Sequence, residues 1–349
     1  MSERSADFRI GVLDDTGRER WDRFVEACPD ATFFHRAGWK GVIERSFGHR
    51  AHFLYAESGG EICGVLPLVH VKSRLFGNYL AASAFCVYGG PVGTSSGALA
   101  ALDAAALRLA QETGVDHIEY RSRIARPLDG WATKSDLYAT FRKPIDPDPE
   151  KNMLAIPRKQ RAMVRKGIKF ELASEIDPAA SRLHRVYAES VRNLGTPVFA
   201  RRYFDNLKQE FGDACEVLMI THQGKDVAGV MNFYFRDEVL PYYGGGTAAA
   251  RQLAANDFMY WEVMRRACER GYKLFDFGRS KRGTGAFDFK KNWGFTPEPL
   301  NYQYRLIKST ELPDLNPLNP KFKLFIEIWK RLPLGVANAI GPYIVRNLG

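Results

Sequence analysis

Two stretches of the chain, about 160 residues apart, carry the same pattern of apolar and polar positions. Each stretch reads as an apolar strand, a tight glycine turn and a second apolar strand that contains an acidic–x–x–Gly–Val element. The two stretches are FLYAESGGEICGVLPLV at 53–69 and VLMITHQGKDVAGVMNF at 217–233. A repeat of this length predicts that one structural unit is used twice.

The elements that follow each stretch are repeated as well. A third strand is predicted to end in a glycine-rich loop, and apolar residues at helical spacing then predict an amphipathic helix that ends at a glycine. The loops are at 88–91 and 243–246, the helices at 98–113 and 256–270, and short strands follow at 115–122 and 272–280. Before the second copy, Asp177 is the predicted N-cap of a helix that reaches Leu194, and another helix is predicted at 201–211.

This order of elements predicts the fold class and the domains. We expect an α+β (mixed α/β) protein with two tandem domains, each a twisted mixed sheet flanked by helices. The polar segment 146–152 joins them, so the predicted domains are 1–152 and 153–308. Residues 309–349 are predicted to form a linker rich in Pro and Asn, followed by a basic amphipathic tail.

The composition adds an excess of positive charge. The 349 residues include 50 Lys and Arg against 40 Asp and Glu, which gives a formal net charge of +10. This balance favours an anionic partner, although it also serves simply to keep a protein in solution. The densest clusters lie at 157–169, at 281–291 and in the tail, and these are the places where we expect an anionic donor, acceptor or membrane to bind.

The N-terminus and the cysteines indicate the compartment. The first ten residues are polar and lack the apolar core of a signal peptide, and no apolar run is long enough for a membrane span. The five cysteines are well separated, which predicts buried thiols in a reducing compartment. We therefore expect a cytoplasmic protein, either free or peripheral to the inner face of the cytoplasmic membrane. The histidines lack ligand spacing, so no metal site is predicted.

One motif suggests a different chemistry. Residues 93–97 (GTSSG) match the G-x-S-x-G nucleophile elbow of hydrolases and precede a predicted helix. However, the preceding strand is expected to end at Gly89, the second copy has no equivalent serine, and no His and Asp pair completes a triad. An ordinary turn before a helix is therefore the favoured interpretation.

The segment 275–295 (FDFGRSKRGTGAFDFKKNWGF) carries the most specific motif in the chain. It combines an aromatic–Asp–x–Gly strand end, a glycine-containing loop and the sequence Phe-Lys-x-x-Trp-Gly. With the duplication and the basic segment 156–167, it resembles the FemAB/FemX family of non-ribosomal peptidyltransferases, which have two tandem GNAT-like (acetyltransferase-type) domains. The overall sequence character is most similar to the FemAB-like branch associated with PEP-CTERM/exosortase exopolysaccharide systems.

The resemblance implies roles for four residues of this chain. Lys290 matches the lysine at the reaction centre, and Phe289 matches its neighbour. Tyr203 and Tyr243 match tyrosines that line the acceptor site. Activated esters and thioesters need no protein nucleophile, because an amine attacks the carbonyl directly while the enzyme aligns the reactants and stabilises the oxyanion. Lys290 would supply positive charge to that oxygen.

Two cations of the family pattern are missing. Ile43 and Phe199 stand where members with a nucleotide-linked acceptor have basic residues, so the resemblance supports acyl transfer more than that acceptor. Arg201, a cation near the second of these positions, is a candidate for substrate binding. Asp276 and Asp288 are candidate proton acceptors, and Asp276 could equally cap the backbone.

Two acyl donors are candidates from the sequence. No tightly bound cofactor is expected; the co-substrate is an activated acyl donor, either aminoacyl-tRNA or acyl-CoA. Four residues between a strand and a helix could bind its anionic part through backbone amides, although a plain tight turn is the commoner explanation. They are Gly244, Gly245, Gly246 and Thr247. The segment 251–254 is a degenerate acetyl-CoA loop, and the basic run 157–169 could face tRNA phosphates.

These features lead to one expected function and two alternatives. We expect an acyl- or aminoacyltransferase that modifies an amine of an anionic envelope or exopolysaccharide-related precursor. The nearest alternative is a GNAT-type acyl-CoA N-acyltransferase acting on an amino sugar or polysaccharide precursor, and the alternative from another class is a non-catalytic, membrane-peripheral scaffold. The tail, residues 321–349, has five cations against one acid and either lies in a membrane interface or docks on the first domain. The oligomeric state is not indicated.

Overall fold

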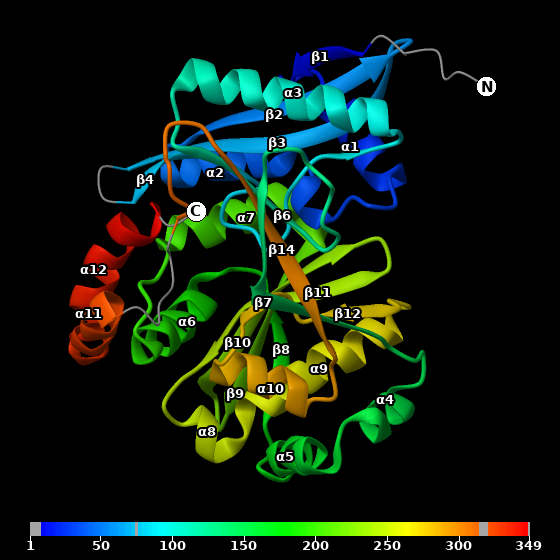
Figure 1. Cartoon of the computed structure of the whole chain (residues 1–349). Coiled ribbons are helices and arrows are strands. Elements are labelled where there is room, and N and C mark those ends of the chain that lie inside the picture. Colours follow the sequence, from blue (N-terminus) through cyan, green and yellow to red (C-terminus); the bar gives the residue numbers. More distant parts are fainter. Residues whose placement is uncertain (1–7, 74–75, 314–319, 348–349) are drawn as a thin grey trace. The chain divides into compact units, whose positions relative to one another are not determined.

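The computed structural model describes residues 8–73, 76–313 and 320–347, without the side chains of 320–323 (Figure 1). Its contacts divide the chain into two compact units. Unit 1 comprises residues 1–137, 299–314 and 347–349, and unit 2 comprises residues 138–298 and 315–346. The chain passes from unit 1 into unit 2 within one long strand and returns to unit 1 within another.

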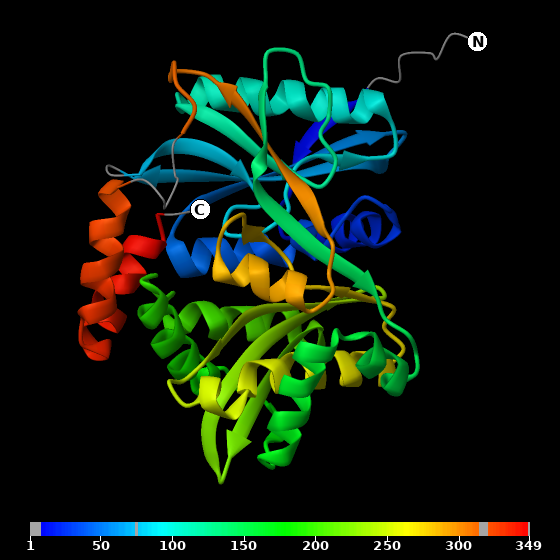
Figure 2. The ribbon, with the colours of Figure 1, turned by 60° about the horizontal axis from the view of Figure 1, so that its bottom comes forward.

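Unit 1 is a mixed sheet with helices on both faces. Its strands are β1 (Arg9–Val12), β2 (Arg50–Ser58), β3 (Glu61–Ser73), β4 (Gly77–Ala82), β5 (Val92–Gly93), β6 (His117–Ser122), the first part of β7 (Ala132–Pro144) and most of β14 (Pro297–Leu306). Its helices are α1 (Arg18–Ala27), α2 (Gly38–Phe47) and α3 (Ser96–Thr113), with a 3₁₀ turn at Phe33–His35. Helix α3 packs on one face of β2 and β3, and α1 and α2 pack on the other (Figure 2).

Unit 2 repeats this layered arrangement. Its strands are the end of β7, β8 (Ala173–Asp177), β9 (Cys215–His222), β10 (Lys225–Phe235), β11 (Glu238–Gly246), β12 (Leu274–Asp276) and β13 (Ser280–Lys281). Its helices are α4 (Pro149–Ala155), α5 (Arg158–Lys169), α6 (Ser181–Leu194), α7 (Arg201–Phe211), α8 (Ala250–Leu253), α9 (Ala255–Glu269), α10 (Gly285–Asn292), α11 (Pro320–Arg331) and α12 (Leu334–Val345), with a 3₁₀ turn at Gly212–Ala214. The strand order is β7-β12-β11-β10-β9-β8, with β13 beside β7.

The duplication predicted from the sequence is present in both units. In unit 1, β2, β3 and β4 form an antiparallel meander, and α3 then leads to β6, which lies parallel to β4. In unit 2, β9, β10 and β11 form the meander, and α9 leads to β12, which lies parallel to β11. One strand–helix–strand plan is therefore used twice, as expected for tandem GNAT-like domains.

The domain boundaries differ from the prediction. The first unit ends at Leu137, before the polar join at 146–152, because the end of β7 pairs with β12 in unit 2. Strand β14 belongs mainly to unit 1, where it pairs with β6, although it was predicted to end the second domain. The tail is part of unit 2 rather than a separate segment. These pairings join residues distant in sequence, which local patterns do not show.

Three local predictions can be compared with the structure. The predicted cap Asp177 is the last residue of β8, its carboxylate accepts from the Ala179 amide at 2.9 Å, and α6 begins later, at Ser181. The predicted loop 243–246 is strand, because β11 pairs with β10 up to Gly246. Ser95 of the GTSSG segment is the N-cap of α3. The ordinary turn interpretation of that segment is therefore confirmed.

The three glycines of β11 allow helices to approach the sheet from both sides. A Cβ on Gly245 would lie 2.6 Å from the Cβ of Ser190 on α6, whereas one on Gly244 would face α9. Because successive side chains of a strand point to opposite faces, α6 and α9 cover opposite faces of unit 2. The glycines therefore set helix–sheet distances.

We predict that Gly245→Ala lowers the free energy of unfolding by about 1–3 kcal/mol, since the added methyl overlaps α6. Urea denaturation provides the measurement. Gly335→Ala is the matched control, because its Cβ would meet nothing within 4 Å and alanine favours the α12 helix. Equal stability of Gly245→Ala and the wild type would contradict the packing role.

Candidate functional site

The parallel strands β11 and β12 separate shortly after they begin. Among the described residues they pair at Glu238 with Leu274 and at Val239 with Phe275. Strand β11 then continues to Gly246, whereas β12 ends at Asp276. The edge of β11 that faces β12 is therefore no longer covered by that strand after Val239. A strand edge of this kind can hydrogen-bond an extended ligand.

Strand β11 also carries a bulge where it leaves β12. In its ladder with β10, Pro241 pairs with Asn232 and Tyr243 pairs with Met231, so Tyr242 is an extra residue on β11. A bulge changes the direction of backbone groups and side chains, and bulges are enriched beside active sites. The bulge and the separating strands together mark this part of unit 2 as the candidate active site.

Two tyrosines reach the same part of β11 from opposite faces of the sheet. The hydroxyl of Tyr260, on α9, lies 3.2 Å from the position of a Cβ on Gly244, and its ring packs 4.8 Å from Phe277, just after β12. Tyr187, on α6, lies against Gly245. In the described part of the chain neither hydroxyl has a hydrogen-bond partner, and both residues are half-buried. Both hydroxyls can therefore bind a ligand.

The pKa values of these tyrosines keep both hydroxyls protonated. Burial, together with the nearby Asp257, raises the pKa of Tyr260 to about 12. Burial also raises the pKa of Tyr187, and proximity to Tyr260 adds to this shift. At neutral pH each group is therefore a neutral hydrogen-bond donor. The sequence predicts neither residue as part of the site, because Tyr187 falls on the predicted apolar face of its helix and Tyr260 lies outside the apolar stripe of its own helix.

Lys290 lies on α10, and its ammonium is directed at three backbone carbonyl groups. Its Nζ donates to the oxygens of Phe277 at 2.6 Å, Gly278 at 3.1 Å and Arg279 at 3.1 Å. An ammonium has three donors, so this arrangement uses all of them. In this conformation Lys290 fixes the segment 277–279, which continues from β12, instead of donating to a substrate oxygen.

The charge state of Lys290 is set by opposing effects. Burial lowers its pKa to about 7, Arg279 acts in the same direction, and Asp276 opposes both. The three carbonyl acceptors favour the ammonium form. Asp276 is fully buried, accepts from the Gly278 amide at 2.7 Å and forms an ion pair with Arg142. It therefore caps the backbone, which was the second of its two expected roles, while Asp288 is exposed on α10.

The structure brings Tyr203 and Tyr243 together but separates Arg201 from them. The two tyrosine hydroxyls are 2.8 Å apart, and both residues are buried in an aromatic cluster with Phe199. Their hydrogen bond joins α7 to β11. Arg201 is exposed at the start of α7 and forms an ion pair with Asp205. Phe289, the remaining predicted residue, packs against Tyr260 at a ring distance of 5.6 Å.

Two backbone amides just after β11, those of Thr247 and Ala248, already have protein partners. The Thr247 amide donates to the carbonyl oxygen of Val227 at 2.9 Å, and the Ala248 amide donates to the carboxylate of Glu189 at 2.8 Å. A carboxylate therefore occupies a position that a phosphate would take at such a turn. The degenerate motif at 251–254 lies mostly in the short helix α8.

The corresponding place in unit 1 is filled by its own chain. Strand β4 ends at Ala82, earlier than predicted, and the chain then turns back so that Gly89 forms a bridge with Arg121 of β6. The Arg121 guanidinium is buried, where it binds the Glu119 carboxylate at 2.5 Å and the Cys86 carbonyl oxygen at 3.0 Å. A concavity beside it measures about 60 Å³, which is too small for an acyl donor.

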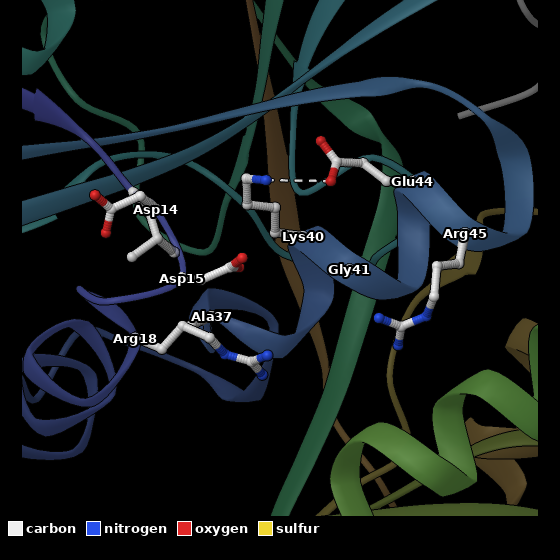
Figure 3. A pocket seen from close by; sticks show the side chains of 9 residues that line it. Asp14, Asp15, Arg18, Ala37, Lys40, Gly41, Glu44 and Arg45 are labelled. Carbon is white, nitrogen blue, oxygen red and sulfur yellow. Dashed lines mark hydrogen bonds and ion pairs between the residues drawn. The ribbon is translucent and has the colours of Figure 1, made fainter.

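A larger concavity in unit 1, of about 160 Å³, lies between α1 and α2 (Figure 3). Its charged side chains include both signs, and Lys40 is paired with Glu44 at 3.1 Å. Asp14, also in the lining, caps the Thr16 and Gly17 amides. Ile43, where the resemblance expects a cation, is fully buried and cannot contact a ligand. The mixed charge does not favour a nucleotide diphosphate.

Comparison with known proteins identifies a domain family for unit 2 and similar folds for the chain. Residues 151–291 match a family described as "Acetyltransferase (GNAT) domain", and this range lies within unit 2. No curated protein sequence matches the chain. The crystal structure of FemX is similar with a TM-score of 0.68 and 16% identity, covering 91% of this chain and 100% of FemX.

Two further solved structures share the fold. The C-terminal domain (DUF2156) of a putative lysylphosphatidylglycerol synthetase from Agrobacterium fabrum has a TM-score of 0.56 and 15% identity, over 83% of this chain and 92% of that one. A tandem GNAT protein from the clavulanic acid biosynthesis pathway has a TM-score of 0.54 and 13% identity, and the match covers 88% of this chain and 100% of that protein. Residues 151–291 thus form a GNAT-type acyltransferase domain, which makes the chain a transferase. Its fold is FemX-like, and the comparisons do not extend to the PEP-CTERM branch.

We predict that Lys290→Met lowers the free energy of unfolding by about 2 kcal/mol, because three carbonyl groups lose a charged hydrogen-bond donor. Lys291→Met is the matched control. The Lys291 ammonium lies over the Phe287 ring, and its loss should change stability by less than about 0.5 kcal/mol. Chemical denaturation of both variants distinguishes them. An unchanged stability of Lys290→Met would contradict the anchoring role.

Proposed function

We propose that the chain transfers an aminoacyl or acyl group from an activated ester or thioester to an amine of an anionic envelope or exopolysaccharide-related acceptor. The observation that carries this proposal is the edge of β11 where it leaves β12, together with the Tyr260 hydroxyl, which lies 3.2 Å from the position of a Cβ on Gly244. The tRNA donor belongs to the same proposal, supported by the resemblance and by the FemX-like fold, whereas the PEP-CTERM association rests on the sequence resemblance alone.

The proposed reaction uses groups that the site already orients. The neutral amine attacks the carbonyl carbon, a C–N bond forms, and the carbonyl oxygen takes up negative charge. The C–O or C–S bond to the donor then breaks, and the proton lost by the amine ends on the leaving group. Tyr260 donates a hydrogen bond to the reacting oxygen or leaving group. Lys290 acts by fixing residues 277–279 and by its positive charge.

Aminoacyl-tRNA is the donor that the charge distribution favours. Helix α5 packs its face with Val164 and Gly167 toward α9 and exposes most of its cations. A row of exposed cations suits a polyanion, because each phosphate contact releases counterions. The amides near Thr247, by contrast, are occupied by protein groups, including the Glu189 carboxylate. Gly244–Thr247 therefore serve the donor through the strand edge and not through a phosphate loop.

Acyl-CoA is the second candidate donor. Residues 151–291 match the acetyltransferase (GNAT) domain family, and a tandem GNAT protein shares the fold. In this case the chain would be an N-acyltransferase for an amino sugar or polysaccharide precursor. Thermal stabilisation of the purified chain by acetyl-CoA or longer acyl-CoAs, with no binding of charged tRNA, would select this donor.

Binding of alanyl-tRNA and of the same tRNA after deacylation, measured by fluorescence anisotropy at several salt concentrations, tests the donor. We predict tighter binding of the aminoacylated tRNA. For Lys159→Gln/Arg165→Gln we predict a weaker salt dependence: the slope of log K against log salt concentration should fall in magnitude by about 2. Lys72→Gln/Arg108→Gln in unit 1 is the control and keeps the wild-type slope. Binding that does not weaken as salt rises would refute the electrostatic contact.

Tyr260→Phe tests the chemical role of its hydroxyl. We predict a fall in turnover of about 100-fold with little change in stability, because the hydroxyl has no hydrogen-bond partner in the described part of the chain. Tyr272→Phe, a half-buried tyrosine after α9, is the control and keeps full turnover. Turnover is measured with whichever donor binds. Full activity of Tyr260→Phe would remove Tyr260 from the mechanism.

A further inference from the structure

The two C-terminal helices dock on unit 2 through part of their surfaces. Both α11 and α12 pack against α6 (Figures 1 and 2). Trp329 of α11 is buried, and on α12 the residues Ala337, Gly341 and Val345 are buried at helical spacing. The Arg192 guanidinium on α6 donates to the carbonyl oxygen of Lys330 at 3.2 Å. The tail therefore packs on α6 of unit 2, whereas the sequence leaves open a membrane interface or docking on the first domain.

This docking leaves a second, apolar part of both helices exposed. The exposed fractions of six large apolar side chains range from 37% to 67%. They are Leu324, Phe325 and Ile328 on α11 and Val336, Ile340 and Tyr343 on α12. On α12 these residues follow an i, i+4, i+7 spacing and form a stripe beside the buried one. Six exposed apolar side chains on one helix pair exceed the scattered single residues expected of an ordinary surface.

The charges beside these side chains identify the kind of surface they fit. Arg331 and Arg346 are exposed, and Lys330 forms an ion pair with Glu327, the one acid of the last 29 residues. A second copy docked here would bring positive charges together, which disfavours a homodimer. An anionic lipid surface offers both negative headgroups and an apolar layer for the exposed side chains.

We propose that α11 and α12 attach the protein to the surface of an anionic bilayer. The exposed side chains of Leu324, Ile328 and Ile340 enter the acyl boundary, and Arg331 and Arg346 contact lipid phosphates. No helix in the described residues is long and apolar enough to cross a membrane, so the attachment is peripheral. This proposal is independent of the donor, and it would place the acyl transfer beside lipid-linked acceptors.

Co-sedimentation of the full-length protein with vesicles of phosphatidylglycerol and phosphatidylcholine, compared with phosphatidylcholine alone, tests the attachment. We expect binding to the anionic vesicles that weakens as salt rises. The variant Leu324→Ser/Ile328→Ser/Ile340→Ser should bind at least about tenfold more weakly, because less apolar surface enters the bilayer. Arg331→Gln/Arg346→Gln should show a comparable loss on anionic vesicles.

A matched triple variant tests whether vesicle binding depends on the surface of α11 and α12 or on exposed apolar side chains in general. Leu154, Ile124 and Ile176 are similarly exposed but lie outside α11 and α12, so Leu154→Ser/Ile124→Ser/Ile176→Ser should bind like the wild type. Circular dichroism and thermal unfolding confirm that each variant is folded. Absence of wild-type binding, or an equal loss in the matched variant, would overturn the proposal. The proposal would also be overturned if the wild type were a dimer and Leu324→Ser/Ile328→Ser/Ile340→Ser converted it to a monomer, since the surface would then bind a second copy.

Discussion

The separation of β11 from β12 is the constraint on which the proposed site depends. A parallel pair that continued along the whole strand would use the backbone groups on both edges of β11, and no extended ligand could bind there. The bulge at Tyr242 and the three glycines that follow belong to the same short stretch. Because glycine lacks a side chain, α6 packs directly on Gly245, and the Tyr260 hydroxyl of α9 lies against Gly244.

The two copies of the repeated unit have the same order of strands and helix but differ at the edge of the third strand. Unit 1 closes the equivalent edge with its own segment, through the bridge between Gly89 and Arg121 and the buried ion pair with Glu119. In unit 2, β12 does not pair with that edge after Val239, and the Lys290 ammonium fixes the segment that follows β12. The match to the acetyltransferase domain covers residues 151–291, within unit 2, in agreement with a site there.

Much of the fold could be predicted from local patterns. Helices α3, α7 and α9 lie close to their predicted ranges, because their apolar spacing and terminal glycines are local signals. The pairing of β14 with β6 was not predictable, since it joins residues about 180 apart and depends on the assembled sheet. The sequence predicts a loop at the three glycines of β11, because it does not show that α6 and α9 fill the space beside them.

The candidate site could be predicted only in part. The motif around Lys290 located the correct region, but three backbone carbonyl groups that surround its ammonium become visible only after the chain has folded. The sequence does not predict Tyr187 and Tyr260 as site residues, because a tyrosine on a helix carries no motif and Tyr187 fits the apolar face of its helix. Their importance comes from α6 and α9 lying on opposite faces of one strand, which is a property of the tertiary structure.

Hydrogen–deuterium exchange with and without saturating donor reports which strand edge the donor covers. We expect slower exchange across residues 240–246 and 277–279 of unit 2. No change is expected across residues 83–91 of unit 1, where the equivalent edge is already filled. Protection confined to unit 1, with unchanged exchange along β11, would contradict the assignment of the site.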